Sequence, residues 1–231
     1  MSQEAVLQEA QATRTTRLLA CGIVAGPLFL AVWWIQALTR EGFDPTYHPL
    51  SLLSLGDMGW IQVANFVVTG LLCVACAVGL RRALRSGRSG TVGPILVGVN
   101  GIGLVIAGIF VTDAGAGFPA GAPTGAPEQI SWHAILHEVG FVVASLAWVV
   151  ACFVFLRRFA TLKQWGWVGV CVAAPLAYIV LAAWPDLDSL SVRLVIGSAI
   201  SFGFVAALAG HLIRGLRTAP QPRAMAGTVT R

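Results

Sequence analysis

Six apolar runs of about 20 residues dominate this chain of 231 residues. A run of that length crosses a hydrocarbon core of roughly 30 Å, because an α-helix rises about 1.5 Å per residue. The runs are apolar all round, whereas helices of soluble domains are usually shorter and amphipathic. Since 57% of the residues are hydrophobic and 11% are charged, and the mean hydropathy is +0.79, we predict an all-α polytopic membrane bundle. The six expected transmembrane helices cover residues 18–38, 60–80, 91–112, 131–156, 165–184 and 194–213.

The distribution of positive charge predicts the orientation of these spans. Thirteen of the 15 Lys and Arg residues flank alternate ends of the spans, and only Arg40 and Arg193 lie at the other ends. Cytoplasmic loops of membrane proteins carry such an excess of Lys and Arg. We therefore expect a multi-pass plasma-membrane protein whose two termini are cytoplasmic. Its expected parts are an N-terminal arm (1–17), a six-helix transmembrane domain (18–213) and a polar basic tail (214–231).

The same bias accounts for the formal net charge of +5. The expected partners are therefore membrane lipids, and no nucleic-acid motif is present. The five cysteines lie inside apolar runs, where they are interpreted as packing residues rather than as disulfides or metal ligands. Two features interrupt the apolar pattern near the predicted outer face. The run HPLSLLSLG is too short to span, which predicts a re-entrant or interfacial segment, and the second span carries Gln62 and Asn65.

Ionisable residues are concentrated on the predicted outer side of the membrane. Seven of the ten acids lie there, and the candidate ligand-binding residues are His48, Asp57, Asp113, His133, His137 and Glu138. His133 and His137 are four residues apart and share one helix face. His137 and Glu138 are expected about 6–8 Å below the start of their helix. Ionisable groups at that depth face the bundle interior or a water-filled cavity.

Three interpretations of these residues remain open. In the first, His133, His137 and Asp113 hold a zinc ion, and the protein is a metal-dependent intramembrane hydrolase. The HExxH motif of zinc proteases is absent, because Glu138 follows the second histidine and points about 140° away from His133.

In the second interpretation the group binds a polar ligand or carries protons, as in a small proton-coupled transporter. In the third, His137 and Glu138 bond to other helices or to the long loops and stabilise the outer face. The function that we expect is a non-enzymatic membrane protein with an outer-face site for a lipid or small ligand and with no cofactor. The hydrolase and the transporter are its alternatives.

Three sequence motifs resemble a known family. They are FDPTYHPLSLLSLGDMGWIQVANFVVTGLL, GIFVTDAGAGFPAGAP and SWHAILHEVGF. The chain resembles the bacterial six-helix membrane proteins grouped as domain of unknown function 998, from the first span to the sixth. The resemblance implies a six-helix fold and a membrane location, and it brings no established activity. Members commonly read TDP in the second motif, where this chain has Ala114 after Asp113.

Overall fold

Six long α-helices and one short 3-10 helix make up the computed structural model. The structure describes residues 3–84, 87–127, 129–186 and 188–218. The helices are α1 (Gln3–Thr39), η1 (Leu50–Ser54), α2 (Gly59–Leu84), α3 (Gly87–Ile109), α4 (Trp132–Thr161), α5 (Trp165–Ala183) and α6 (Leu190–Thr218). Within the described residues no β-strand is found.

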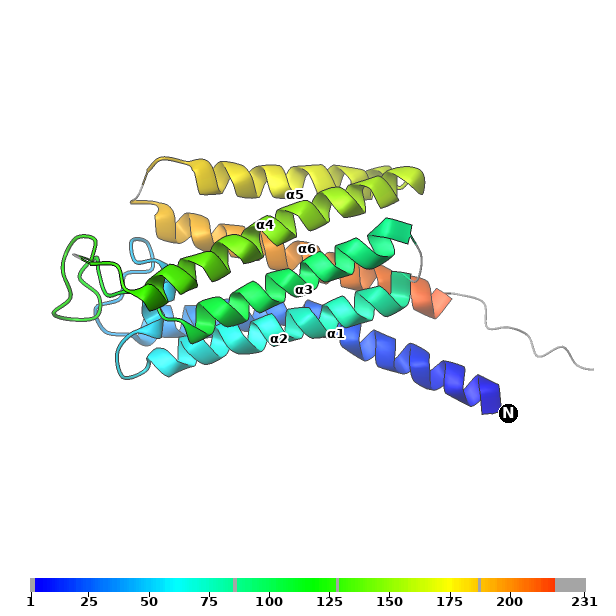
Figure 1. Cartoon of the computed structure of the whole chain (residues 1–231), viewed down its shortest axis with the longest axis horizontal. Helices are drawn as coiled ribbons and strands as arrows, with labels where there is room; N and C mark the ends of the chain where they lie inside the picture. The colour runs from blue at the N-terminus through cyan, green and yellow to red at the C-terminus, as the bar shows by residue number, and fades with distance from the viewer. Residues whose placement is uncertain (1–2, 85–86, 128, 187, 219–231) are drawn as a thin grey trace, which may run out of the picture.

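All six α-helices are long and apolar enough to cross a membrane. This confirms the predicted all-α fold with six transmembrane helices. Residues 3–17 of the predicted arm are helical and continue directly into the first span. The predicted tail begins as the last turns of α6, and its residues 219–231 lie outside the described residues. The first helix begins and the last helix ends at the same end of the bundle (Figure 1), and the cytoplasmic location of that end stays a prediction.

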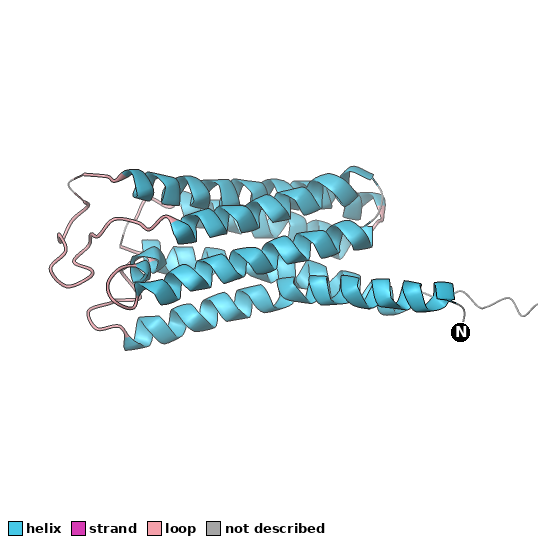
Figure 2. Ribbon diagram, turned by 60° about the horizontal axis from the view of Figure 1, so that its bottom comes forward, coloured by secondary structure: helices cyan, strands magenta, loops and turns pink. Residues whose placement is uncertain are grey.

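The six helices form a closed ring. Each helix packs against the next one in the chain, and α6 packs against α1. The described residues of the connections 40–58, 110–131 and 184–189 lie together at one end, which we call the loop end (Figures 1 and 2). The opposite end, here the basic end, carries the arginines of the last turns of α2, α4 and α6.

Close backbone contacts hold α3 between α2 and α4. A Cβ atom added to Gly70 would collide with the carbonyl oxygen of Gly101. A Cβ atom on Gly103 would lie 2.6 Å from the carbonyl oxygen of Gly140 and 2.8 Å from the amide nitrogen of Ala144. Glycine therefore allows the three helices to approach each other more closely than any other residue would. The three helices form the most tightly packed part of the ring.

The short helix η1 covers the loop end of the bundle. Its residues Leu50, Leu52 and Leu53 are buried, and it packs against α1, α2 and α6. The segment predicted to be re-entrant or interfacial is thus a 3-10 helix that closes the ring from one side. Beneath it lies an apolar cluster that includes Phe29 and Phe118.

The tight packing of α3 generates a test with a matched pair of glycines. We expect Gly103→Ala to destabilise the protein by about 1–3 kcal/mol, because α3 and α4 must separate to admit the methyl group. Gly169→Ala on α5, where nothing lies within 4 Å of the added Cβ, should be neutral or stabilising by up to about 1 kcal/mol. Thermal unfolding in detergent measures both variants. Equal unfolding temperatures for the two would contradict the close contact.

Candidate functional site

Two of the predicted site residues meet at the start of α4. The Ser131 amide N–H donates to Asp113 Oδ2 at 2.7 Å, and the Ser131 hydroxyl donates to Asp113 Oδ1 at 2.6 Å. His133 Nδ1 lies 4.0 Å from Asp113 Oδ1 and 3.0 Å from Ser131 Oγ. We call Asp113, Ser131 and His133 the α4 cluster. It joins the 110–131 connection to the first turn of α4.

Ser131 organises this cluster because it is the N-cap of α4. Its Oγ accepts a hydrogen bond from the Ala134 amide at 3.2 Å, as serine does at many helix starts. Asp113 then places a carboxylate beside the positive end of the helix dipole. The Ser131 hydroxyl and amide hold the pKa of Asp113 below its ordinary value. The carboxylate is therefore ionised at neutral pH.

One ring nitrogen of His133, Nε2, has no hydrogen-bond partner among the described residues. Its Nδ1 donates to the carbonyl oxygen of Val111 at 2.8 Å, so that Nδ1 carries the proton in the neutral ring. The side chain of His133 is 39% exposed and that of Asp113 is 16% exposed. Trp132, which is 67% exposed, contacts the His133 ring edge-on. The side chains of Asp113, His133 and Trp132 thus lie together at an accessible position at the start of α4, which we call the α4 corner.

His137 lies one turn further along α4 than His133 and is almost completely buried. Its Nδ1 is 2.7 Å from the carbonyl oxygen of Ala107 and 3.0 Å from that of Phe110. The Ala107 carbonyl belongs to the last turn of α3 and Phe110 directly follows the helix, where carbonyls lack further helical N–H groups to bond. Because carbonyls only accept, Nδ1 carries the proton. His137 therefore caps the C-terminus of α3 from the neighbouring helix.

Glu138 and Asp57 lie apart from the α4 cluster. Glu138 is exposed on α4, and Asp57 is exposed in the 40–58 connection. The Asp57 carboxylate partly offsets, through its charge, the lowering of the Arg40 pKa that burial causes. The structure thus separates the six candidate residues instead of gathering them around one point.

His48 belongs to a second group at the loop end. Its Nδ1 accepts from the Asp44 amide at 2.8 Å, and its Nε2–H donates to the Ala116 carbonyl at 2.9 Å. The hydroxyl of Ser191 donates to the His48 carbonyl at 2.7 Å. His48 therefore ties the 40–58 connection to the 110–131 connection and to α6.

Both arginines of the loop end bind backbone carbonyls. Arg40 donates to Leu55 O at 2.6 Å and lies over the ring of Phe118. Arg193 donates to the carbonyls of Leu181 and Asp186. Sequence reasoning missed this role, as it missed Ser131 and Ser191. A signal was available, since Arg40 and Arg193 are the two exceptions to the charge bias.

The described residues contain no group of three or more His, Cys, Asp or Glu side chains placed to hold a metal ion. His137 Nδ1 is engaged by two carbonyls, and Asp113 is engaged by Ser131. Nε2 is the ring nitrogen of His137 that a zinc ion could still use, since a histidine ligand commonly donates its other ring N–H to a backbone carbonyl. The hydrolase with zinc bound by His133, His137 and Asp113 stays a prediction.

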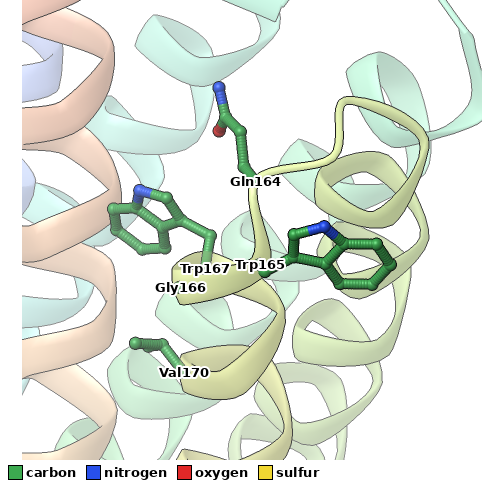
Figure 3. Close-up of a pocket in the computed structure, with 5 residues that line it drawn as sticks. All are labelled: Gln164, Trp165, Gly166, Trp167 and Val170. Atoms are coloured by element: carbon green, nitrogen blue, oxygen red, sulfur yellow. The ribbon is translucent and has the colours of Figure 1, made fainter.

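Two surface hollows lie outside the α4 cluster. A pocket of about 280 Å³ at the start of α5 is lined by Gln164, Trp165, Gly166, Trp167 and Val170, and the two indoles extend to opposite sides of the helix start (Figure 3). An apolar groove of about 520 Å³ between α1 and α6 is lined in part by Trp33 and Ile196. No predicted site residue lines either hollow.

The comparisons with known proteins agree with the architecture. A family model described as "Protein of unknown function (DUF998)" matches residues 23–211. The chain belongs to this family. The match confirms the resemblance seen in the three sequence motifs. The comparison with curated proteins and the comparison with solved structures each return no match. Membership of DUF998 and six apolar helices make this an integral, multi-pass membrane protein.

The contacts of His137 predict a loss of stability when it is replaced. We expect His137→Leu to cost about 1–3 kcal/mol, because the buried Ala107 carbonyl and the partly buried Phe110 carbonyl lose their donor. His133→Leu should cost less, since water can reach the half-exposed site of His133. Unfolding in detergent, followed by tryptophan fluorescence, measures both variants. A larger loss for His133→Leu would contradict the assignment of His137 as the cap.

The lowered pKa of Asp113 predicts an effect of acid. A carboxyl group whose pKa is lower in the folded state stabilises the protein above its unfolded pKa of about 3.9. That contribution is lost as the pH falls toward the folded pKa. Acidification from pH 6 to pH 3 should therefore lower the unfolding temperature of the unsubstituted protein more than that of Asp113→Asn. Parallel pH profiles for the two proteins would contradict this.

Proposed function

We propose that this DUF998 protein is a non-enzymatic membrane protein that binds a lipid head group at the α4 cluster. The observation that carries the proposal is the pairing of an ionised Asp113 carboxylate with the half-exposed imidazole of His133. Both lie at the start of a transmembrane helix, where the head groups of a bilayer are found. Membrane lipids are therefore the ligands present at the highest concentration beside the α4 corner.

The charge of the loop end favours a head group that carries an ammonium ion. Asp44, Asp57, Asp113, Asp186 and Asp188 all lie at this end. The two arginines of the same end are bonded to backbone carbonyls and lie away from the α4 cluster in sequence. An ammonium group can donate to the carboxylate of Asp113, and the exposed face of Trp132 attracts cations.

The imidazole of His133 supplies the second half of the recognition. Its Nε2 is the ring nitrogen left over after Nδ1 has bonded to Val111 O. When protonated, Nε2 can donate to a phosphate oxygen beside the ammonium group. A zwitterionic head group carrying both groups, such as that of phosphatidylethanolamine, therefore fits the pair.

The proposal is tested by lipid binding measured with native mass spectrometry. Phosphatidylethanolamine should bind more tightly than phosphatidylglycerol, and Asp113→Asn should remove roughly a tenfold preference, the effect of one charge-assisted hydrogen bond. Asp188→Asn is the matched control, because it removes the same charge from an exposed position at the same end. It should leave the preference unchanged.

A second variant separates binding from structural support. Ser131→Ala removes the N-cap hydroxyl and its hydrogen bond to Asp113, while it keeps the backbone amide donor and the carboxylate. It should lower the unfolding temperature and retain the preference for phosphatidylethanolamine. If Asp113→Asn lost stability as Ser131→Ala does but kept the lipid preference, the α4 cluster would be a helix cap and the proposal would fail.

A further inference from the structure

A second polar group lies inside the bundle, between the loop-end halves of α1 and α2. Gln36 Nε2 donates to Gln62 Oε1 at 2.8 Å, and Asn65 Nδ2 donates to the same oxygen at 3.2 Å. Asn65 Nδ2 also donates to the backbone carbonyl of Phe29 at 3.0 Å. Thr69 lies one turn further along α2. We call Trp33, Gln36, Ser54, Gln62, Asn65 and Thr69 the α1–α2 polar site.

Every member of this site is at least nine-tenths buried. The exposed fraction is 0% for Gln62 and Thr69 and no more than 7% for the other four. Each of them nevertheless has a polar atom without a hydrogen-bond partner among the described residues. These atoms are Trp33 Nε1, Gln36 Oε1, Ser54 Oγ, Gln62 Nε2, Asn65 Oδ1 and Thr69 Oγ1.

Unpaired polar atoms are costly in a membrane helix, because hydrocarbon offers no partner. A site built only for packing would carry leucine, valine or alanine at these positions. Six unpaired atoms on two facing helices and their cover indicate instead a surface that binds something when the bundle opens. We therefore propose that the α1–α2 polar site binds a small uncharged molecule that both donates and accepts hydrogen bonds.

The set of unpaired atoms specifies the chemistry of this ligand. The indole N–H of Trp33 and the amide N–H groups of Gln62 call for acceptors. The amide oxygens of Gln36 and Asn65 call for donors, and the hydroxyls of Ser54 and Thr69 serve either way. An anion would face the two amide oxygens, and a cation would face the N–H groups. Amides, small alcohols and water satisfy both kinds of atom.

The position of the site shows from which side it fills. Gln62 is three residues and Thr69 ten residues from the start of α2, so that the site reaches about 15 Å into a core of roughly 30 Å. Further along the same helix Cys73, Cys76 and Leu80 are buried in apolar surroundings. The site therefore ends near the middle of the membrane, and the loop end is the nearer side from which water can reach it.

The 40–58 connection covers that opening. Ser54, the last residue of η1, belongs to the site, and its carbonyl touches Gly59 at the start of α2. The connection is held down from α6, since the Ser191 hydroxyl lies 2.9 Å from Pro45 O and 2.7 Å from His48 O and shares its one proton between these two carbonyls. The closed cover explains why the unpaired atoms are buried in this structure. Release of the Ser191 contacts would admit a ligand.

Hydroxyl-radical footprinting of the protein in lipid nanodiscs tests whether the site opens. Radicals formed from water oxidise tryptophan, and Trp33 should be oxidised several-fold faster than Trp148. Trp148 is the matched control, because it is 1% exposed and its Nε1 is also unpaired among the described residues, yet it lies in the other buried cluster. Ser191→Ala should speed the oxidation of Trp33 further and leave Trp148 unchanged.

Small solutes identify the ligand class in the same assay. Acetamide should slow the oxidation of Trp33, whereas acetate and methylammonium, which are similar in size but charged, should not. Gln62→Met and Thr69→Val should each abolish the effect of acetamide, and Gln164→Met at the basic end should keep it. Two variants are used so that one remains informative if the other does not fold.

The outcomes separate the possibilities. Oxidation of Trp33 that acetamide does not slow identifies water itself as the occupant. Equal protection by acetamide and acetate overturns the assignment of an uncharged ligand. Oxidation of Trp33 as slow as that of Trp148, both in the unsubstituted protein and in Ser191→Ala, shows that the site does not open and overturns the proposal.

Discussion

Hydrogen bonding of backbone carbonyls at the loop end is the requirement on which the rest of the structure depends. Helix ends leave carbonyl groups without helical partners, and a bilayer core supplies none. In this protein side chains from other segments provide the donors. His137 serves α3, Arg193 serves the end of α5, and Arg40 serves the segment that contains η1. These bonds join the connections into one cap over the ring.

The same requirement explains why so many histidines and arginines are not available for chemistry. A ring N–H that is held by a backbone carbonyl fixes the orientation of its imidazole. His137 is held through Nδ1–H, whereas His48 is held through Nε2–H and accepts a hydrogen bond at Nδ1. Among the histidines of the loop end, His133 is the one with a substantially exposed side chain. That difference in exposure, rather than residue type, distinguishes a candidate ligand-binding group from a structural one.

The spans could be predicted from the sequence because length and apolarity depend on local residues alone. The approach of Asp113 and His133 was predictable in part, since both flank one connection. The role of Ser131 was not predictable, because serine occurs at many helix starts. Only the fold shows that Ser131 donates two hydrogen bonds to Asp113. Gln62 and Asn65 stood out as polar residues within a span. Gln36, the partner of Gln62, comes from another helix, and no pattern within either segment indicates that pairing.

The ring arrangement has a consequence for the order of assembly in the membrane. Helices that are neighbours in the chain are neighbours in the ring, so most of the packing can form as each span emerges during synthesis. The contact between α1 and α6 is different, because it joins the first span to the last. Until α6 arrives, the bundle is an open arc whose α1 edge faces lipid. Closure of the ring and the Ser191 contacts that fasten the cap therefore both require the insertion of the last span.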